Sequence, residues 1–250
     1  VLAMSAGAAS QEAIWQEVEC GGYAADLSVW AGLASAAGGP VLDLGAGDGR
    51  VTMDLAGRGH RVTAVDLSEP LLGELRRRAE ARGLEVETVC GDVRLFEPRE
   101  SFSAVLAPMQ LVHIIDGPTG RAALLDAVRR QLAPGAAFAA AVLSDAATWA
   151  PFDPLRPPAP DVREVDGWVY SSLSLEPAMV PGGIEVRRLR QVVSPAGELT
   201  EQFDAIRLDT LTADDFELEA RRFGLIPRER IVIDPSDEHV GTVVCVLEVG

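Results

Sequence analysis

The chain has 250 residues, which is enough for one α/β domain with a full hydrophobic core and too few for two such domains. Its formal net charge of −16 at pH 7 argues against a nucleic-acid partner, because gripping phosphates requires clustered Lys and Arg. Three cysteines without Cys-x-x-Cys spacing indicate reduced thiols in a cytoplasmic protein. No apolar run approaches the roughly 18 residues of a membrane span, so no membrane partner is expected either.

The first part of the chain is predicted to be helical. Apolar residues recur at helical spacing from Gln11 to about Val18 and again from Ala25 to Ala36. Between these helices a flexible joint carries an aromatic side chain, Tyr23. We therefore expect a helical cap that precedes the first strand.

The stretch from Val41 to Arg50 runs an apolar strand directly into a glycine-rich turn. Gly45, Gly47 and Gly49 let the backbone turn sharply and approach a ligand closely, while the following helix points its free N–H groups at the same place. This pattern is typical of a nucleotide-binding cradle. It departs from the dinucleotide pattern Gly-x-Gly-x-x-Gly because its sixth position is Arg50, which argues against NAD.

Three further strands are predicted before position 110, and each ends at a candidate binding residue. A strand over 61–66 ends at Asp66, an acid placed to accept hydrogen bonds from two ribose hydroxyls. A strand over 86–90 is followed by Asp92, an acceptor for an adenine amino group. A strand over 103–107 completes this set. Ligands of open α/β sheets bind at the carboxyl ends of the strands, so these residues are expected to meet.

The alternation of helix and strand continues and then breaks. A helix over 121–132 and a strand over 138–143 are followed by five prolines between 151 and 160, which predict an extended loop. Three runs of strand-like residues then predict an antiparallel meander, and a helix and two strands complete the chain. The ranges of the meander are 165–176, 184–193 and 198–208, and those of the last elements are 212–223, 231–233 and 242–249.

Side-chain alternation divides the meander into two faces. Trp168, Tyr170 and Ser172 share one face, which shapes a substrate pocket if it covers the strand ends and forms a dimer contact if it points outward. Two arginine clusters, 76–78 on a helix and 187–190 on a strand, are interpreted as solvated faces.

Four motifs in order resemble the class I S-adenosylmethionine-dependent methyltransferases. They are Val-Leu-Asp-Leu-Gly-Ala-Gly-Asp-Gly at 41–49, Val-Asp-Leu-Ser at 65–68, Gly-Asp-Val at 91–93 and Leu-Ala-Pro-Gly at 132–135. The resemblance implies an α/β fold with a Rossmann-like, doubly wound seven-stranded sheet of order 3-2-1-4-5-7-6 and an antiparallel last strand, with N-terminal helices and the inserted antiparallel β meander. One domain over 1–250 would then comprise a cap (1–37), a cofactor-binding core (38–144 and 210–250) and an insertion that serves as a lid or a dimer element (145–209).

The resemblance also implies roles for individual positions. The methionine part of the cofactor would lie against Asp43, Gly45, Ala46, Gly47 and Gly49, its ribose and adenine against Asp66, Leu67, Asp92 and Val93, and its sulfonium against Ala107, Pro108 and Met109. Tyr23 lies where the family's N-terminal helices close over the cofactor, although core packing explains it equally well. Candidate substrate contacts are Gln110, His113, Trp168 and Tyr170.

His113 is also the candidate general base, because the unperturbed pKa of histidine lies near neutrality. A buried histidine whose hydrogen bonds are satisfied is the equally open alternative.

The function expected from these features is methyl transfer from S-adenosylmethionine to an oxygen or nitrogen atom of a small molecule, by direct displacement without a metal. The product cofactor would be S-adenosylhomocysteine, and the protein a monomer or a homodimer. The tip at 107–110 lacks the Asn/Asp-Pro-Pro-aromatic pattern of nucleic-acid amino-methylation sites and carries no carboxylate cluster for magnesium. An NAD-dependent oxidoreductase and a catalytically silent cofactor-binding scaffold are the alternatives.

Overall fold

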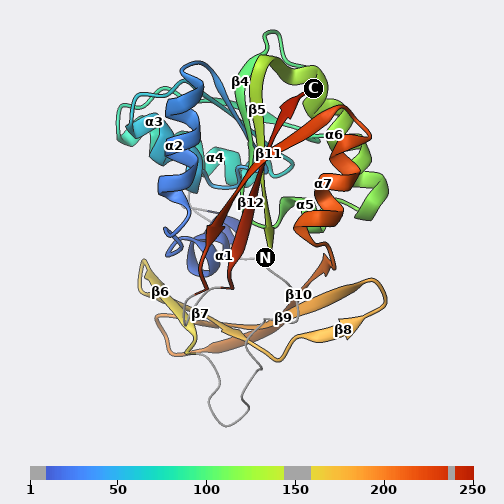
Figure 1. The fold of residues 1–250 in the computed structure, drawn as a ribbon. Helices are drawn as coiled ribbons and strands as arrows, with labels where there is room; N and C mark the ends of the chain where they lie inside the picture. Colours follow the sequence, from blue (N-terminus) through green and yellow to red (C-terminus); the bar gives the residue numbers. More distant parts are fainter. Residues whose placement is uncertain (1–9, 144–158, 236–239) are drawn as a thin grey trace.

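The computed structural model describes residues 10–143, 159–235 and 240–250, which form an α/β core with a second sheet beside it (Figure 1). The core sheet has seven strands in the order β11-β12-β5-β4-β1-β2-β3, and β12 is antiparallel to both neighbours. The predicted order 3-2-1-4-5-7-6 with an antiparallel last strand is therefore confirmed. The strands are β1 (Val41–Leu44), β2 (Val62–Asp66), β3 (Glu87–Cys90), β4 (Phe102–Ala107), β5 (Leu132–Leu143), β11 (Leu225–Ile233) and β12 (Thr242–Val249).

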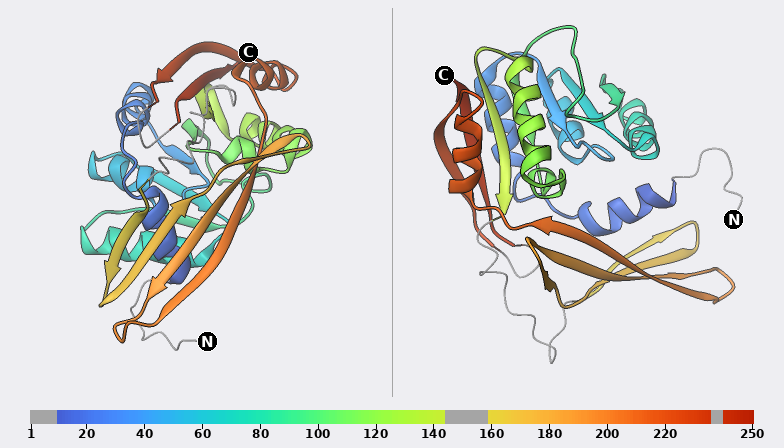
Figure 2. Two further views of the ribbon diagram at one scale, coloured as in Figure 1. Left: turned by 90° about the horizontal axis from the view of Figure 1, so that it is seen from below. Right: turned by 90° about the vertical axis from the view of Figure 1, so that its right-hand side faces the viewer.

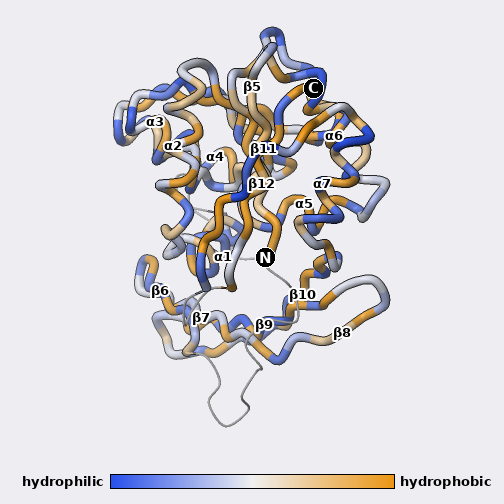
Figure 3. Tube along the Cα trace, in the orientation of Figure 1, coloured by the Kyte–Doolittle hydropathy of each residue, from blue (hydrophilic) through white to orange (hydrophobic). Residues whose placement is uncertain are grey.

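Helices cover both faces of this sheet (Figure 1). One face carries α2 (Leu27–Ala37), α3 (Arg50–Gly57) and α4 (Glu69–Ala81), and the other carries α5 (Leu111–Ile114), α6 (Gly117–Gln131) and α7 (Ala213–Arg221). Because both faces are covered, the central strands are apolar almost throughout. Figure 3 shows these strands as the hydrophobic centre of the core.

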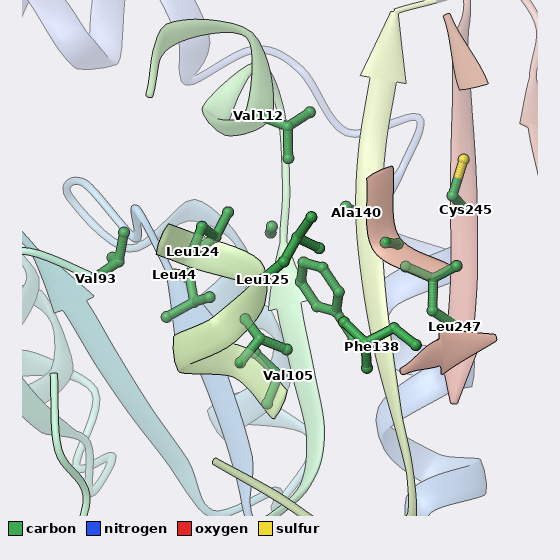
Figure 4. Packing of buried hydrophobic residues seen from close by; sticks show 14 of the residues in the cluster. Leu44, Val93, Val105, Val112, Leu124, Leu125, Phe138, Ala140, Cys245 and Leu247 are labelled. Atoms are coloured by element: carbon green, nitrogen blue, oxygen red, sulfur yellow. The ribbon is translucent and has the colours of Figure 1, made fainter. Parts of the chain in front are cut away.

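The core on the α6 side is a continuous cluster of aliphatic and aromatic side chains (Figure 4). Leu44 of β1 and Phe138 of β5 meet Leu125 of α6 there, and Leu247 of β12 extends the cluster. On the opposite face Trp30 of α2 is fully buried. Burying a large apolar side chain contributes roughly 1.5–3 kcal/mol, so both clusters stabilise the packing of helices on the sheet.

Side-chain hydroxyls cap the first turns of two helices. The Ser68 hydroxyl accepts from the backbone N–H of Leu71 at 3.3 Å at the start of α4, and the Thr212 hydroxyl accepts from that of Asp215 at 3.1 Å at the start of α7. The predicted helix over 121–132 ends one residue early, at Gln131, and the strand predicted from 138 already begins at Leu132.

The second sheet has five strands and is antiparallel throughout, so the predicted meander is confirmed. The run predicted at 165–176 is two strands, because Asp166 and Gly167 take positive φ values of 52° and 78° and make a tight hairpin turn. The predicted proline-rich loop at 151–160 lies outside the described residues except for its last two. The strands are β6 (Asp161–Val165), β7 (Trp168–Ser174), β8 (Ala178–Val180), β9 (Gly183–Val193) and β10 (Leu199–Asp209).

The helix α1 (Gln11–Cys20) lies between the core and the second sheet, as the right-hand view of Figure 2 shows. Glu19 accepts hydrogen bonds from the guanidinium of Arg190 at 2.7 and 2.8 Å and from the Ser172 hydroxyl at 2.8 Å. Two residues earlier, Glu17 forms ion pairs with Arg78 of α4 and Arg163 of β6, both at 2.7 Å. Two carboxylates of α1 thus join the core to the second sheet.

These contacts correct the interpretation of the arginine clusters as solvated faces. The side chains of Arg78, Arg188 and Arg190 are only 24%, 23% and 16% exposed. Each of them pairs with a carboxylate of α1. Arg78 pairs with Glu17, and Arg188 and Arg190 pair with Glu19, from which Arg188 lies 3.9 Å away. Arg76 and Arg77 are exposed, as predicted.

Replacing Glu19 with Gln should loosen the second sheet from α1, because the partly buried guanidinium of Arg190 would lose its bidentate carboxylate. We expect the free energy of unfolding to fall by about 1–3 kcal/mol, and amide hydrogen exchange in β7 and β9 to accelerate. Glu12→Gln, on the exposed side of the same helix, is the matched control and should stay within about 0.5 kcal/mol of the wild type. Equal exchange rates in the two variants would contradict this role of Glu19.

Candidate functional site

The carboxyl ends of β1, β2, β3 and β4 lie next to one another, because these strands are parallel neighbours in the sheet. This edge brings together the four predicted cofactor segments, 43–49, 66–67, 92–93 and 107–109. The turn after β1 is fixed to β2, since the backbone N–H groups of Gly45 and Ala46 both donate to the carbonyl of Val65, at 2.9 and 3.1 Å.

The glycine-rich turn has the backbone that only glycine adopts readily. Gly45, Gly47 and Gly49 have φ values of +68°, +57° and +91°. A Cβ on Gly49 would lie 2.2 Å from Leu75 of α4, and one on Gly45 would lie 3.2 Å from Leu111 of α5. The turn is therefore a closely packed cradle in which bare backbone faces the strand ends, as the implied cofactor requires.

Asp66 connects the cradle to the start of α4. Its Oδ2 accepts from the backbone N–H of Gly47 at 2.8 Å, and its Oδ1 accepts from that of Ser68 at 2.8 Å. The next side chain, Leu67, is 71% exposed, so an apolar surface lies open beside the carboxylate. An acid with an exposed apolar neighbour fits a ribose and an adenine ring, and the assignment of these two residues stays a prediction.

Asp92 has a partner that the sequence did not reveal. Its carboxylate accepts from the guanidinium of Arg94 at 2.7 Å (Nη2) and 2.9 Å (Nε), which lowers the pKa of Asp92. Arg94 also donates to Asp116 at 2.6 Å and so links the β3 end to the loop before α6. Val93 is buried in the core, so its side chain supports the site from beneath.

Asp43 is a buried carboxylate at the end of β1. Its Oδ2 accepts from the Thr52 hydroxyl at 2.6 Å, whereas its buried Oδ1 has no hydrogen-bond partner within the described residues. Burial raises the pKa of Asp43 to about 6. An orphaned buried acceptor beneath the cradle suits a cationic donor, such as the ammonium of the cofactor's methionine part.

Arg50 is the residue that separates this turn from the dinucleotide pattern, and its side chain closes the cap. It donates to the Asp26 carboxylate at 2.5 and 2.8 Å and to the carbonyl of Tyr23 at 3.0 Å. The Tyr23 ring lies over its guanidinium, 5.0 Å from ring centre to carbon. The indole N–H of Trp30 donates to Asp26 at 2.8 Å and completes the cluster. Tyr23 thus packs on the cap beside the cradle, which is compatible with both of its predicted roles.

The tip of β4 turns sharply beside the cradle. Ala107 and Pro108 are buried, and Met109 takes a φ of +57°, a backbone region that non-glycine residues occupy rarely. Gln110 follows, and its carbonyl accepts from the backbone N–H of His113 at 2.8 Å. No titratable side chain lies between Ala107 and Gln110.

His113 is buried and both of its ring nitrogens are engaged. The backbone N–H of Leu143 donates to Nε2 at 3.0 Å, so the ring proton resides on Nδ1, which donates to the carbonyl of Asp209 at 2.9 Å. Burial lowers the pKa of His113 and keeps it neutral. This geometry favours the buried, satisfied histidine over the general base, since neither nitrogen has a lone pair left for a substrate proton.

The predicted substrate contacts of the meander lie away from the strand ends. Tyr170 packs edge-on against Trp15 of α1, with 5.4 Å between the ring centres, and Trp168 is half-buried nearby on the same strand. The polar-aromatic face of β7 thus meets α1 rather than the cradle itself. Within the described ranges no group of three or more His, Cys, Asp or Glu side chains is arranged to hold a metal ion.

The segment that forms this edge of the sheet is similar to known methyltransferases. Residues 41–135 match the model of a methyltransferase domain. The cypemycin N-terminal methyltransferase of a Streptomyces species is 37% identical over 97 residues, which are 39% of this chain and 39% of that protein. A ubiquinone biosynthesis O-methyltransferase of Paramagnetospirillum magneticum is 31% identical over 111 residues, 44% of this chain and 43% of that protein. The matches thus span about two fifths of these relatives.

The whole fold also has a counterpart among solved structures. The sugar N-methyltransferase KedS8 of a Streptoalloteichus species superposes with a TM-score of 0.75 at 17% sequence identity, over 99% of this chain and 96% of that one. At this identity the likeness concerns the fold, and it includes the part of the chain that forms the second sheet.

Gly49→Ala should destabilise the fold by about 2–5 kcal/mol, the sum of a left-handed backbone strain of roughly 1–2 and overpacking against Leu75 of roughly 1–3. Gly57→Ala is the matched control, because its Cβ would enter open space at a helical position, and it should be neutral or stabilising by up to about 1 kcal/mol. Urea unfolding of the two variants measures the difference. Equal stabilities would show that the cradle tolerates a side chain.

Asp43→Asn should stabilise the ligand-free protein above pH 6. The folded pKa of about 6 exceeds the unfolded value of 3.8, so the native state holds a proton that the unfolded chain has lost, and wild-type stability falls as pH rises through this window. The variant lacks this fall and should gain up to about 3 kcal/mol relative to the wild type between pH 4 and 7. Asp126→Asn, at an exposed position, is the control, and a pH-independent difference for Asp43→Asn would contradict the assignment.

Proposed function

The chain belongs to the class I S-adenosylmethionine-dependent methyltransferase family, and on this premise we propose that it transfers a methyl group to a nitrogen or oxygen atom of a small molecule. The single observation that carries the proposal is the edge of the sheet where the glycine cradle, Asp66 and Asp92 meet. The NAD alternative is disfavoured because Arg50 stands at the sixth position of the turn and serves the cap.

The chain's residues have positioning tasks in this reaction. When bound, S-adenosylmethionine supplies an electrophilic methyl carbon on a sulfonium. The cradle backbone would hold its methionine part, Asp66 its ribose and Asp92 its adenine, while the buried Ala107 and Pro108 limit water at the reacting end. Positioning supplies much of the acceleration of such a displacement, so neither a metal nor a covalent intermediate is required.

We favour nitrogen as the acceptor atom. The tip from Ala107 to Gln110 carries no titratable group, and both nitrogens of His113 are engaged by backbone. An amine already in its neutral form attacks without a base, whereas a hydroxyl of ordinary acidity needs one. The names of the relatives include both chemistries, an N-terminal methyltransferase and an O-methyltransferase.

The remaining expectations concern partners and location. We propose a protein of the cytoplasm without nucleic-acid partners, in keeping with the net charge of −16. In the part of the chain that is described, no helix is both long and apolar enough to cross a bilayer. A monomer or a homodimer is expected, and a second copy would pack on the outer face of the second sheet, where Val162, Leu199 and Phe203 are 61%, 56% and 79% exposed.

S-adenosylhomocysteine should raise the thermal midpoint of the protein, because a ligand present at about 100 times its Kd stabilises the folded state by roughly 2.7 kcal/mol. Asp66→Ala should weaken the binding of S-adenosylhomocysteine by about 1–3 kcal/mol in calorimetry. Asp126→Ala, at an exposed position of α6, should leave this affinity unchanged. A shift with NADH in place of S-adenosylhomocysteine would contradict the proposal. Binding without methyl transfer to any amine in a broad panel would instead identify a silent scaffold.

A further inference from the structure

We propose that a cavity between α1, α4 and the second sheet binds a cationic amine that also carries hydroxyl or amide groups, and that it rejects phosphorylated compounds. This inference rests on the proposed function, because it names the class of the methyl acceptor. The cavity is open to solvent on one side and has a volume of about 390 Å³, within the roughly 300–1,000 Å³ of small-molecule sites.

The cavity adjoins the cofactor cradle. Gln16 and Leu71 line it, and the same two side chains stand over Gly47, where a Cβ would lie 3.3 Å from Gln16 and 4.0 Å from Leu71. The side chains of Gln16 and Leu71 therefore lie between the cavity and the cradle. An acceptor held in the cavity would extend past them to reach the methyl group.

Polar side chains without protein partners line the cavity. The amides of Gln11, Gln16 and Gln202 form no hydrogen bond with any of the described residues, and each offers two donors and an acceptor. The indole nitrogen of Trp15 is likewise buried without a partner in the described ranges. Unpaired amides around an aromatic ring suit a ligand rich in hydroxyl groups.

The charge around the cavity selects the sign of the ligand. Arg190 is the one cation among the lining residues, and it is paired with Glu19 at 2.7 and 2.8 Å and with Asp204 at 2.9 Å. The lining carboxylate, Glu12, forms no ion pair with the described residues. The uncompensated charge on the walls is therefore negative.

The other arginines that contact α1 are also paired with carboxylates. Arg78 pairs with Glu17, Asp48 and Glu74, Arg163 pairs with Glu17, and Arg188 pairs with Asp161 and Glu19. No guanidinium among these is left for a phosphate. An ammonium group is attracted to such walls, and a phosphate is repelled by them. The bound ammonium releases its proton to solvent before transfer, because only the neutral amine has the lone pair that attacks the methyl group.

Three probes test the selectivity: D-glucosamine, D-glucose and D-glucosamine 6-phosphate, measured by calorimetry and ligand-observed NMR on the full chain with saturating S-adenosylhomocysteine. We expect D-glucosamine to bind about three- to fivefold more tightly than the other two, the effect of one favourable exposed charge contact. Equal or tighter binding of the phosphorylated probe, or no binding of D-glucosamine, overturns the proposal. Competition between D-glucosamine and S-adenosylhomocysteine also overturns it, because the cavity would then belong to the cofactor.

Variants of the walls locate the site. Glu12→Gln and Gln202→Ala should each weaken D-glucosamine by about three- to tenfold and leave the affinity for S-adenosylhomocysteine unchanged. Glu80→Gln, an exposed position on α4, is the control. Gln202→Arg adds a free cation and should shift the preference toward D-glucosamine 6-phosphate. Unchanged probe affinities in all of these variants overturn the proposal. A wild-type protein that does not bind S-adenosylhomocysteine would refute the proposed function instead.

Discussion

The ion pair between Arg50 and Asp26 is the contact on which the arrangement of the site depends. Arg50 is the first residue of α3, so its side chain starts at the glycine cradle, and Asp26 lies just before α2 and is 2% exposed. Breaking one side of a buried pair leaves an uncompensated charge, at a cost of about 3–5 kcal/mol. The pair therefore holds the cap against the cradle, and with it the aromatic side chains of Tyr23 and Trp30.

The ion pairs of α1 extend this closure to the second sheet. The core has its own apolar clusters, whereas the contact between α1 and the sheet is mainly a set of carboxylates and guanidinium groups around Glu17 and Glu19, with Trp15 and Tyr170 packed beside them. Partly buried ion pairs depend on geometry more steeply than apolar contacts do. They fix the sheet's position over α1, and they leave the space between them without a free cation.

The sequence predicts the half of the site that is built from backbone. Strand ends and a glycine turn follow from local patterns, because hydrophobic runs set the strands and glycine alone accepts the positive φ values of the cradle. Capping residues such as Ser68 and Thr212 are local features as well, because each accepts a hydrogen bond from a backbone N–H three residues further along the chain.

The partners of charged side chains could not be predicted in the same way. Arg50 finds Asp26 across 24 residues, and Arg190 finds Glu19 across 171. Nothing in the periodicity of either segment marks these pairs, so the sequence alone predicts a solvated face for Arg188 and Arg190. The engagement of His113 is similar, since its ring meets backbone groups of β5 and β10 that only the folded topology brings together.

The cradle and the proposed acceptor cavity are built from different parts of the chain. The segment that matches the methyltransferase domain, 41–135, contains the cradle and the strand ends, where the sheet fixes the positions of backbone groups and carboxylates. The cavity, in contrast, is lined mainly by side chains of α1 and the second sheet, with Leu71 of α4 beside them. Changing a carboxylate there alters charge without moving the cradle. In the proposed arrangement, the acceptor is therefore selected largely by side chains outside the matched segment.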